Sequence, residues 1–452
     1  MYSRKRPWLS RSTILFVIIA SICSVPAYAA PPRVIKAVPD HGDTHVDPER
    51  KEIRIEFDQD MNPGGWSICG GGPNFPEFTD KPRWVNKRVL VVPVKLQPDH
   101  EYSFSVNCPS AQNFRNAAGE SAMIYPITFR TAGAKEGAAT KKLSKKANER
   151  SVAELRRLID EAYAYRDLRK VDWDALFKKH EPRMLRAGTQ AAFAREAAAL
   201  LGHAKDVHIL VQVESMPFAT YQRRFKPNYR LDLLEELVPG FTKQNDTVST
   251  GRFDDDIGYI LITTWGPRTP ADLEPAYAAL AEFANAAGVI IDVRPNAGGD
   301  EMLARDFAGC FTAKRAVYSK NAYRTKRAKS GFAKPVERPI EPNKGRPAYR
   351  GKVAVLMGEG VMSSCESFVL MMRHGAGATL IGEKSFGSSG NPKPHKLPNG
   401  VMVALPSWKD MQPDGTIIEG KGIAPDVVVK VKKGDFKDRD PVLDAALEHL
   451  RR

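Results

Sequence analysis

Short runs in which apolar and polar residues alternate dominate residues 31–132. A period of two places every second side chain on one face of a strand, so each run predicts a half-buried β-strand. Turn-forming clusters rich in Gly, Pro, Asn and Asp separate the runs, and Val89-Leu-Val-Val92 is a denser apolar strand. The alternating apolar positions are Ile53, Ile55, Phe57, Tyr102, Phe104, Val106, Ile127 and Phe129. Several short strands with regular turns predict an all-β sandwich over this stretch.

The pattern changes to helical spacing after residue 150. Residues 133–150 are rich in Gly, Ala and Lys and predict a basic linker. Ser151-Val-Ala-Glu154 has the form of a capping box and predicts a helix that starts there. A second apolar stretch, residues 190–201, ends at Gly202. We therefore expect a small helical subdomain over residues 151–205.

Strands and helices alternate over the remaining residues, 206–452. Four apolar runs predict buried strands, and helical segments separate most of them, which is typical of an α/β core with parallel strands. Residues 313–350 are basic, proline-rich and poorly periodic, and they predict a long insertion. The four apolar runs are Ile257–Thr263, Gly288–Val293, Lys352–Met357 and Ala378–Ile381.

The first 30 residues have the organisation of a secretory signal peptide. A basic segment with four Lys or Arg residues precedes the apolar run Ile14–Ala20, and Ala27-Tyr-Ala29 fits a cleavage site. We therefore expect an exported protein, periplasmic or secreted, without an integral membrane segment after cleavage. Removing this segment lowers the formal charge of +15 to about +11, which favours acidic partners and anionic surfaces. Nucleic acid is not an expected partner, since no recognition motif is present.

The cysteines bear on compartment and on cofactors. Cys69 and Cys108 share the first domain, and outside the cytoplasm they either form a disulfide or remain free. Cys310 and Cys365 follow apolar segments and are expected to be small buried residues. No Cys or His spacing indicates a metal site, and we expect no cofactor.

A candidate nucleophile lies where a predicted strand meets a predicted helix. Ser363 and Ser364 follow the run Lys352–Met357 and begin an apolar helix. A helix N-terminus offers free N–H groups to a developing oxyanion, but Ser is also a common helix N-cap. A hydrolase would also need a base and a glycine-rich oxyanion turn, for which residues 296–299 are suited.

Four motifs follow one another along the second half of the chain. They are residues 288–299 ending in Asn-Ala-Gly-Gly, Gly360-Val-Met-Ser-Ser-Cys-Glu366, Leu380-Ile-Gly-Glu-Lys-Ser-Phe-Gly387 and Glu419-Gly-Lys-Gly-Ile-Ala-Pro-Asp426. Together and in this order they resemble the carboxy-terminal processing (tail-specific) and tricorn-like family of serine peptidases. The resemblance covers about residues 150–435 and implies a crotonase/ClpP-like α/β core.

The resemblance also implies site residues. The serine three positions before Glu366 is the nucleophile, which assigns Ser363. The N–H of Ser364 would then join the N–H of Gly298 or Gly299 in the oxyanion hole. The tail-specific branch places a lysine base directly after Phe-Gly, where this chain has Ser388. A lysine mechanism would need another residue, such as Lys384 or Lys393.

The tricorn-like branch supplies a different base. Its His follows the helical part in an Asp-x-His motif, which matches His208, and its acid precedes the last motif, which matches Glu419. The resemblance therefore implies that His208 takes the proton of Ser363 and that Glu419 orients or polarises His208. Tricorn has a Ser before the His that links it to the acid, and this chain has Val207 there.

Residues 31–132 resemble bacterial Ig-like domains of envelope proteins, which implies a spacer or docking module for an envelope partner. Only about 45 residues separate His208 from Ile257, which is too few for the PDZ domain common in the tail-specific branch. The expected function is an exported serine peptidase that hydrolyses polypeptides through Ser363, His208 and Glu419. The rival hypothesis is an inactive envelope scaffold that binds peptide tails on a peptidase fold.

Overall fold

The structure is a computed structural model, and it describes residues 31–108, 111–133, 143–213, 216–218, 220, 221, 223, 225–326, 331–432 and 434–452. The expected signal peptide and half of the expected linker, residues 134–142, lie outside the described residues. The chain forms two compact units. One contains Lys51–Lys95, Phe104–Pro126 and the described residues up to Val38; the other contains Pro39–Arg50, Leu96–Ser103 and Ile127–Arg452.

The N-terminal region is β-rich, as its alternating pattern predicts. Ile53, Ile55 and Phe57 lie at the buried positions of one strand, while their polar neighbours face outward. A disulfide joins Cys69 and Cys108, so the first of the two alternatives for these cysteines is correct. One sheet has the order β1 (Val34–Val38), β2 (Glu52–Phe57), β6 (Val89–Lys95) and β4 (Glu77–Phe78), with β5 (Arg83–Asn86) also on β6; the other has the order β3 (Ile68–Cys69), β7 (Glu101–Val106) and β8 (Tyr125–Arg130).

A seven-stranded sheet forms the centre of the α/β core. The four predicted strands lie next to one another in the order β13, β14, β17 and β18, and all run parallel. Apart from Asp292 at the end of β14, their buried residues are mostly apolar on both faces, as expected for parallel strands covered by helices on both sides. The complete order is β11 (Thr242–Lys243), β12 (Val248–Phe253), β13 (Ile257–Ile262), β14 (Gly288–Asp292), β17 (Lys352–Met357), β18 (Thr379–Gly382) and β22 (Val427–Val428).

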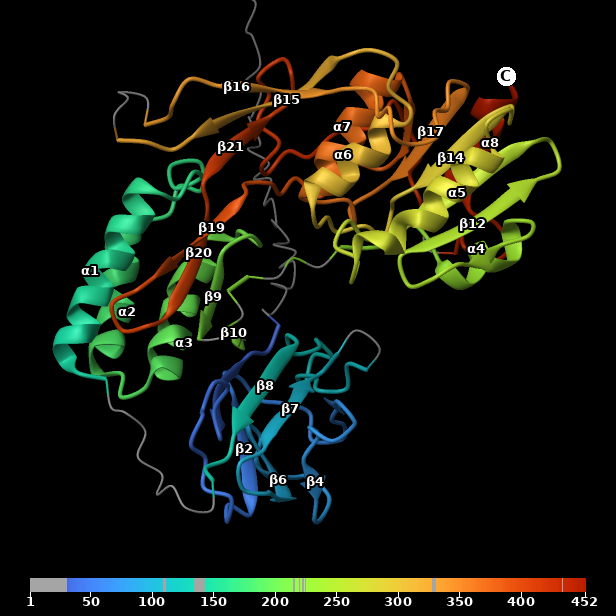
Figure 1. The fold of residues 1–452 in the computed structure, drawn as a ribbon. Helices are drawn as coiled ribbons and strands as arrows, with labels where there is room; N and C mark the ends of the chain where they lie inside the picture. Colours follow the sequence, from blue (N-terminus) through green and yellow to red (C-terminus); the bar gives the residue numbers. More distant parts are fainter. Residues whose placement is uncertain are drawn as a thin grey trace, which may run out of the picture. The chain divides into compact units, whose positions relative to one another are not determined.

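Helices cover both faces of this sheet (Figure 1). On one face, α5 (Glu274–Glu282), α6 (Glu301–Gly309) and α7 (Ser364–Met371) share one apolar cluster with alternate residues of β13, β14 and β17. On the other face, α4 (Leu231–Leu237) and α8 (Pro441–Arg451) pack against the remaining alternate residues. Because β14 and β17 are paired neighbours, the turns that follow them meet at one edge of the sheet.

Three helices precede the core: α1 (Lys145–Glu161), α2 (Trp173–Arg186) and α3 (Gln190–Leu201). The predicted start of the first helix at Ser151 is wrong. The N-cap is Ser144, whose side chain accepts from the N–H of Ala147, and residues 145–150 of the expected linker are helical. Ser151 is buried within α1 and donates to the carbonyl of Ala147, so its apparent capping box has no capping role.

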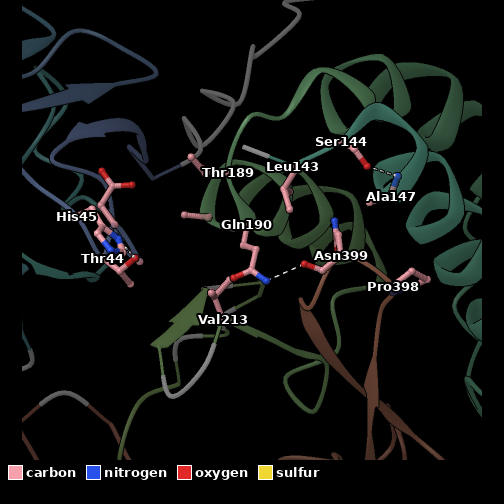
Figure 2. Close-up of a pocket in the computed structure, with 13 residues that line it drawn as sticks. Thr44, His45, Leu143, Ser144, Ala147, Thr189, Gln190, Val213, Pro398 and Asn399 are labelled. Carbon is pink, nitrogen blue, oxygen red and sulfur yellow. Dashed lines mark hydrogen bonds between the residues drawn. The ribbon is translucent and has the colours of Figure 1, made fainter. Parts of the chain in front are cut away.

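The three helices pack on a sheet, so they do not form a separate all-helical core. Their apolar cluster includes Val211, Val403 and Leu405, which come from strands on both sides of residues 256–382 in the sequence. Gln190 on α3 donates to the carbonyl of Asn399 at 2.7 Å, and Figure 2 shows this contact. This sheet has the order β10 (Met216–Phe218), β9 (Leu210–Val213), β20 (Met402–Pro406) and β19 (Pro392–Lys396).

The insertion at residues 313–350 contains two strands that its weak periodicity did not predict. Strands β15 (Ala316–Tyr323) and β16 (Val336–Ile340) pair with each other, and β15 also pairs with β21 (Trp408–Met411). A shift of register within β15 near Val317 interrupts the alternation that would have signalled a strand.

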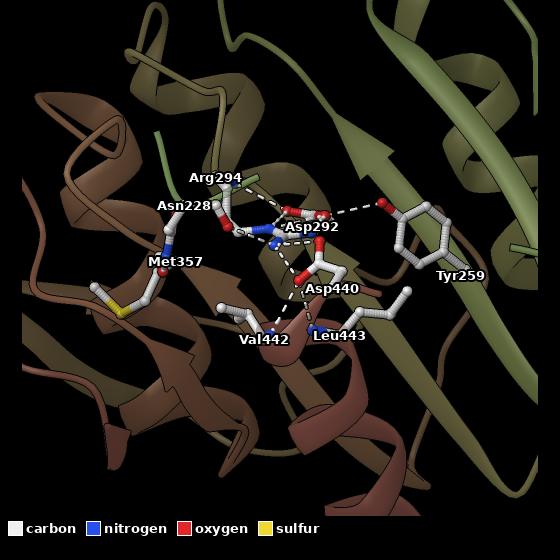
Figure 3. A network of polar contacts seen from close by, with 8 residues as sticks. All are labelled: Asn228, Tyr259, Asp292, Arg294, Met357, Asp440, Val442 and Leu443. Carbon is white, nitrogen blue, oxygen red and sulfur yellow. Dashed lines mark hydrogen bonds and ion pairs between the residues drawn. The ribbon is translucent and has the colours of Figure 1, made fainter. Parts of the chain in front are cut away.

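A buried ionic cluster fixes the turn that follows β14 (Figure 3). Arg294 lies between the carboxylates of Asp292 and Asp440, at 2.7 and 2.8 Å, and all three side chains are almost fully buried. Asp440 also caps α8, and the hydroxyl of Tyr259 donates to Asp292 at 2.9 Å. Breaking such a buried cluster leaves an uncompensated charge, which costs about 3–5 kcal/mol. The cluster thereby anchors residues 294–299 to the sheet and to α8.

Candidate active site

Ser363 lies at a sharp turn between β17 and α7. Its backbone has φ 55° and ψ −129°, a left-handed conformation that is strained for a residue with a side chain. Strained turns between a strand and a helix hold the nucleophiles of many hydrolases. The N–H of Ser363 donates to the carbonyl of Ser388 at 2.9 Å. Although Ser363 occupies the N-cap position, its side chain makes no capping hydrogen bond, so the alternative of a plain helix cap does not describe it.

His208 lies within hydrogen-bond distance of this serine. Its Nε2 is 3.0 Å from Ser363 Oγ, across 155 residues of sequence. The backbone N–H of His208 donates to a carboxylate oxygen of Asp206 at 2.9 Å, which fixes the turn that leads into β9. Burial lowers the pKa of His208, and the nearby Arg169 cation lowers it further, while Asp206 acts in the opposite direction. The imidazole is therefore neutral at pH 7 and can accept a proton.

The other ring nitrogen of His208 contacts Ser388. His208 Nδ1 and Ser388 Oγ are 2.8 Å apart. When Nδ1 carries the proton and donates to Ser388, the lone pair of Nε2 points to Ser363, which is the tautomer that a general base requires. Ser388 occupies the position at which the tail-specific branch has its lysine base. In this chain the residue at that position contacts the candidate base, His208.

Glu366 supports the loop that carries Ser388. It is fully buried on α7 and accepts three hydrogen bonds, from Ser385 Oγ at 2.5 Å and from the N–H groups of Gly387 and Ser388 at 2.8 and 2.9 Å. Burial raises its pKa to about 8, against the effect of these hydrogen bonds. Glu366 therefore fixes the backbone of the loop that carries Ser388.

Glu419 also contacts the loop that carries Ser388, through the neighbouring residue Ser389. It is buried, accepts from the N–H of Ser389 at 2.8 Å and forms an ion pair with Arg169. Burial, with the Asp206 carboxylate nearby, raises its pKa. Among the described residues Glu419 makes no hydrogen bond to His208. The contact with His208 that was expected of Glu419 is made by Ser388. Glu419 binds Ser389, the residue that follows Ser388 in the sequence.

The glycine turn reaches the nucleophile from the neighbouring strand. A side chain on Gly298 would meet Met362 O and Ser363 Cβ at 2.9 Å, so the two turns are in close contact. The N–H of Gly298 is occupied, since it donates to Asn296 Oδ1 at 2.9 Å. The N–H groups of Gly299 and of Ser364, the first residue of α7, have no acceptor among the described residues. Of the three expected oxyanion donors, Gly299 and Ser364 are the ones left available.

The sequence did not predict the contact of Ser388 with His208, the ion pair of Arg169 with Glu419, or the contacts of Asp206. For Ser388 a signal existed, because a small hydroxyl replaced the expected lysine in a loop next to the site. Neither Lys384 nor Lys393 makes a hydrogen bond or ion pair with Ser363 or His208 in the described part of the chain. In the same part, no group of three or more His, Cys, Asp or Glu side chains is placed to hold a metal ion, and no helix has the length and apolar character needed to cross a bilayer.

Comparison with known proteins finds similarity between the core and a peptidase family. Residues 256–429 match the family model of peptidase family S41, and residues 151–196 match that of the tricorn protease C1 domain. Over residues 256–429 the core of this chain is therefore similar to peptidase family S41.

Two curated relatives from Bacillus subtilis are carboxy-terminal processing proteases. The chain is 26% identical to CtpB over 174 residues, which are 38% of this chain and 34% of CtpB. It is 30% identical to CtpA over 200 residues, which are 44% of this chain and 40% of CtpA. The chain thus matches between a third and two fifths of each relative's length.

A solved structure shares the fold over a larger part of the chain. A crystal structure from Parabacteroides merdae, solved as that of a candidate peptidase, superimposes with a TM-score of 0.57 at 24% identity. It covers 69% of this chain and 98% of its own. At this identity the match shows the fold alone.

Proposed function

We propose that this protein is an exported serine peptidase that hydrolyses polypeptides through Ser363 and His208, with Ser388 and Glu419 supporting the base. The observation that carries the proposal is the 3.0 Å distance from His208 Nε2 to Ser363 Oγ at a strained turn between a strand and a helix. The match of the core to peptidase family S41 supports the same chemistry.

The geometry supports an acyl-transfer mechanism. His208 accepts the Ser363 proton as Oγ attacks the carbonyl carbon of the scissile bond. The N–H groups of Gly299 and Ser364 donate to the oxyanion, and the protonated imidazole then gives its proton to the leaving amine. Water then attacks the acyl carbon while His208 takes its proton, and His208 returns this proton to Ser363 Oγ as the ester bond breaks and the acid product leaves. The Nδ1–H of His208 remains bonded to Ser388 throughout, which keeps the ring in position.

The domain organisation belongs to the proposal as well. The substrate is a polypeptide captured by the core itself, because the chain between His208 and Ile257 leaves no room for a PDZ domain. Residues 31–132 act as an Ig-like module for an envelope partner, and residues 1–30 direct export as a signal peptide. The disulfide between Cys69 and Cys108 supports an oxidising compartment.

Peptide-bond hydrolysis tests the proposal against the scaffold alternative. Purified wild type, Ser363→Ala and His208→Ala are incubated with an unfolded polypeptide, and the products are identified by mass spectrometry. We expect cleavage by wild type only, with rates at least about 10⁴-fold lower in both variants. Equal product formation by all three, or binding of the polypeptide by wild type without any cleavage, would contradict peptidase function and favour the scaffold.

A further inference from the structure

Two buried carboxylates lie close to the proposed catalytic pair. One contacts the backbone of His208, and the other contacts the loop whose serine touches the His208 ring. Asp206 accepts the backbone N–H of His208 at 2.9 Å. Glu419 accepts the backbone N–H of Ser389 at 2.8 Å, one residue after the serine that contacts the histidine ring. Both carboxylate side chains are fully buried. Their negative charges therefore need a partner nearby.

One guanidinium group serves both carboxylates. Arg169 Nη2 forms an ion pair with Glu419 and lies 3.8 Å from Asp206 Oδ2. Among the described residues neither carboxylate has another ion pair. The hydroxyl of Tyr163 donates to Asp206 at 2.8 Å and completes the cluster. Burial alone would lower the pKa of Arg169, but the two carboxylates raise it overall, so the cation persists.

Arg169 comes from outside the matched peptidase core. It lies in the segment between α1 and α2, within residues 151–196 and far from residues 256–429 in sequence. His208 also precedes the matched residues 256–429. These residues supply Ser363, Ser388 and Glu419, while the part of the chain before them supplies His208 and Arg169.

We propose that Arg169 is a positioning residue for this peptidase: by binding Glu419 and Asp206 together, it holds the Ser388 loop and the His208 segment in alignment with Ser363. The inference rests on the proposed function and deepens it. Without the guanidinium group, Glu419 and Asp206 lose the one ion-pair partner that joins them, and the Ser388 loop is no longer tied to the His208 segment through this cluster. A displacement of about 1 Å in a catalytic group can lower the rate about 100-fold.

The charge of Arg169 also has a measurable effect on His208. Arg169 lowers the pKa of His208 and Asp206 raises it; these are the charged groups that act on the ring. Removing the cation while keeping Asp206 therefore shifts the titration of His208 to higher pH. A residue with a purely structural role would not move this titration.

The test uses the full mature chain with four substitutions: Arg169→Met, Arg169→Lys, the double change Arg169→Met with Glu419→Gln, and Arg166→Met. Arg166 is the matched control, because it lies in the same segment and pairs at the surface with Asp160 and Asp167. The double variant lacks one carboxylate as well as the cation, so it folds even where Arg169→Met does not.

Two readouts are compared: the pH profile of polypeptide hydrolysis, and the titration of His208 followed by NMR, with its signal assigned from a His208→Gln variant. We expect Arg169→Met to lower kcat about 100-fold with little change in KM and to move the His208 titration to higher pH. The double variant should fold yet remain slow, while Arg169→Lys keeps the wild-type titration and Arg166→Met keeps both rate and titration.

The outcomes separate the inference from the proposed function. If wild type and Ser363→Ala are equally inactive, the proposed function fails, and the NMR titration still decides whether Arg169 acts on His208. An unchanged His208 titration in Arg169→Met, or in the double variant where the single one does not fold, overturns the inference. So does a shift of equal size in Arg166→Met.

Discussion

His208 Nδ1 lies 2.8 Å from Ser388 Oγ, at the position where the tail-specific branch has a lysine base. A serine at this position cannot serve as the base, but it can accept the Nδ1–H and fix the tautomer of a histidine that does. Under the proposed function, this hydroxyl takes the role that the resemblance to tricorn gives to a serine at the position of Val207. The proposed change of base and the serine at residue 388 then belong to one arrangement.

Replacing Ser388 with Ala should lower kcat/KM about 10–100-fold, the range typical of losing a group that orients a functional histidine. The ring would lose its Nδ1 partner, and the productive tautomer would be populated less. Ser388→Thr keeps the hydroxyl and should recover most of the activity. Ser407→Ala is the control, since this hydroxyl donates to Asn391 O and not to the site. Steady-state kinetics on one peptide substrate decide the matter; equal rates for Ser388→Ala and wild type would exclude this role.

The pH dependence of kcat/KM should report His208. The base must be neutral, so activity is lost as the pH falls through its pKa. Burial lowers that pKa below the ordinary value of 6.5, so the acid limb should have its midpoint below pH 6.5. His374→Gln, which changes a histidine outside the site, should leave the limb in place. A midpoint clearly above 6.5 would show that His208 is not held as described.

Glu366 should make the folded state less stable as the pH rises. Burial raises its pKa to about 8 in the folded state, above the ordinary value of 4.5. The stabilising contribution of this group is therefore fully present below about pH 4.5 and is lost as the pH rises towards 8. The slope is at most about 1.4 kcal/mol per pH unit.

Urea unfolding at several pH values between 5 and 8 measures this effect. Glu366→Gln cannot titrate, so its free energy of unfolding should depend less steeply on pH than that of wild type. The buried amide also loses one of the three hydrogen bonds, which lowers its stability at every pH. Parallel pH dependences for the two proteins would contradict the raised pKa.

Adding a methyl group at Gly298 should abolish activity. The Cβ of Gly298→Ala would lie 2.9 Å from Met362 O and Ser363 Cβ, and φ is +103°, which strains any residue with a side chain. The nucleophile or the adjacent oxyanion donors must move, so we expect kcat to fall about 100-fold or more. Gly188→Ala is the matched control, because its Cβ meets no atom within 4 Å. Activity within twofold of wild type in Gly298→Ala would exclude close contact between the two turns.

Sequence patterns predicted those parts of the fold that local physics determines. The apolar runs at residues 257–263, 288–293 and 352–357 became β13, β14 and β17, because a buried parallel strand must be apolar on both faces. The start of α1 was misjudged at Ser151, since an S-x-x-E pattern inside a helix looks the same as one at its beginning. Strand β15 was missed because its register shift breaks the alternation.

The site was predicted in part, but from the order of motifs and the resemblance to a peptidase family, not from local physics. Motif order brought Ser363 and His208 together as candidates, and the structure places them 3.0 Å apart. The contact between Ser388 and His208 joins residues 180 positions apart. No local pattern encodes such a contact, and the same is true of Arg169 and Glu419. These contacts depend on how the helical part packs against the loop after β18.

Activation of Ser363 by His208 can be measured by labelling with a serine-reactive phosphonate, with the modified residue mapped by peptide mass spectrometry. We expect one adduct, on Ser363, in wild type and none in Ser363→Ala. Labelling should be strongly slowed in His208→Ala, with Ser364 unmodified throughout. Labelling of all three proteins alike, or of none, would contradict this activation.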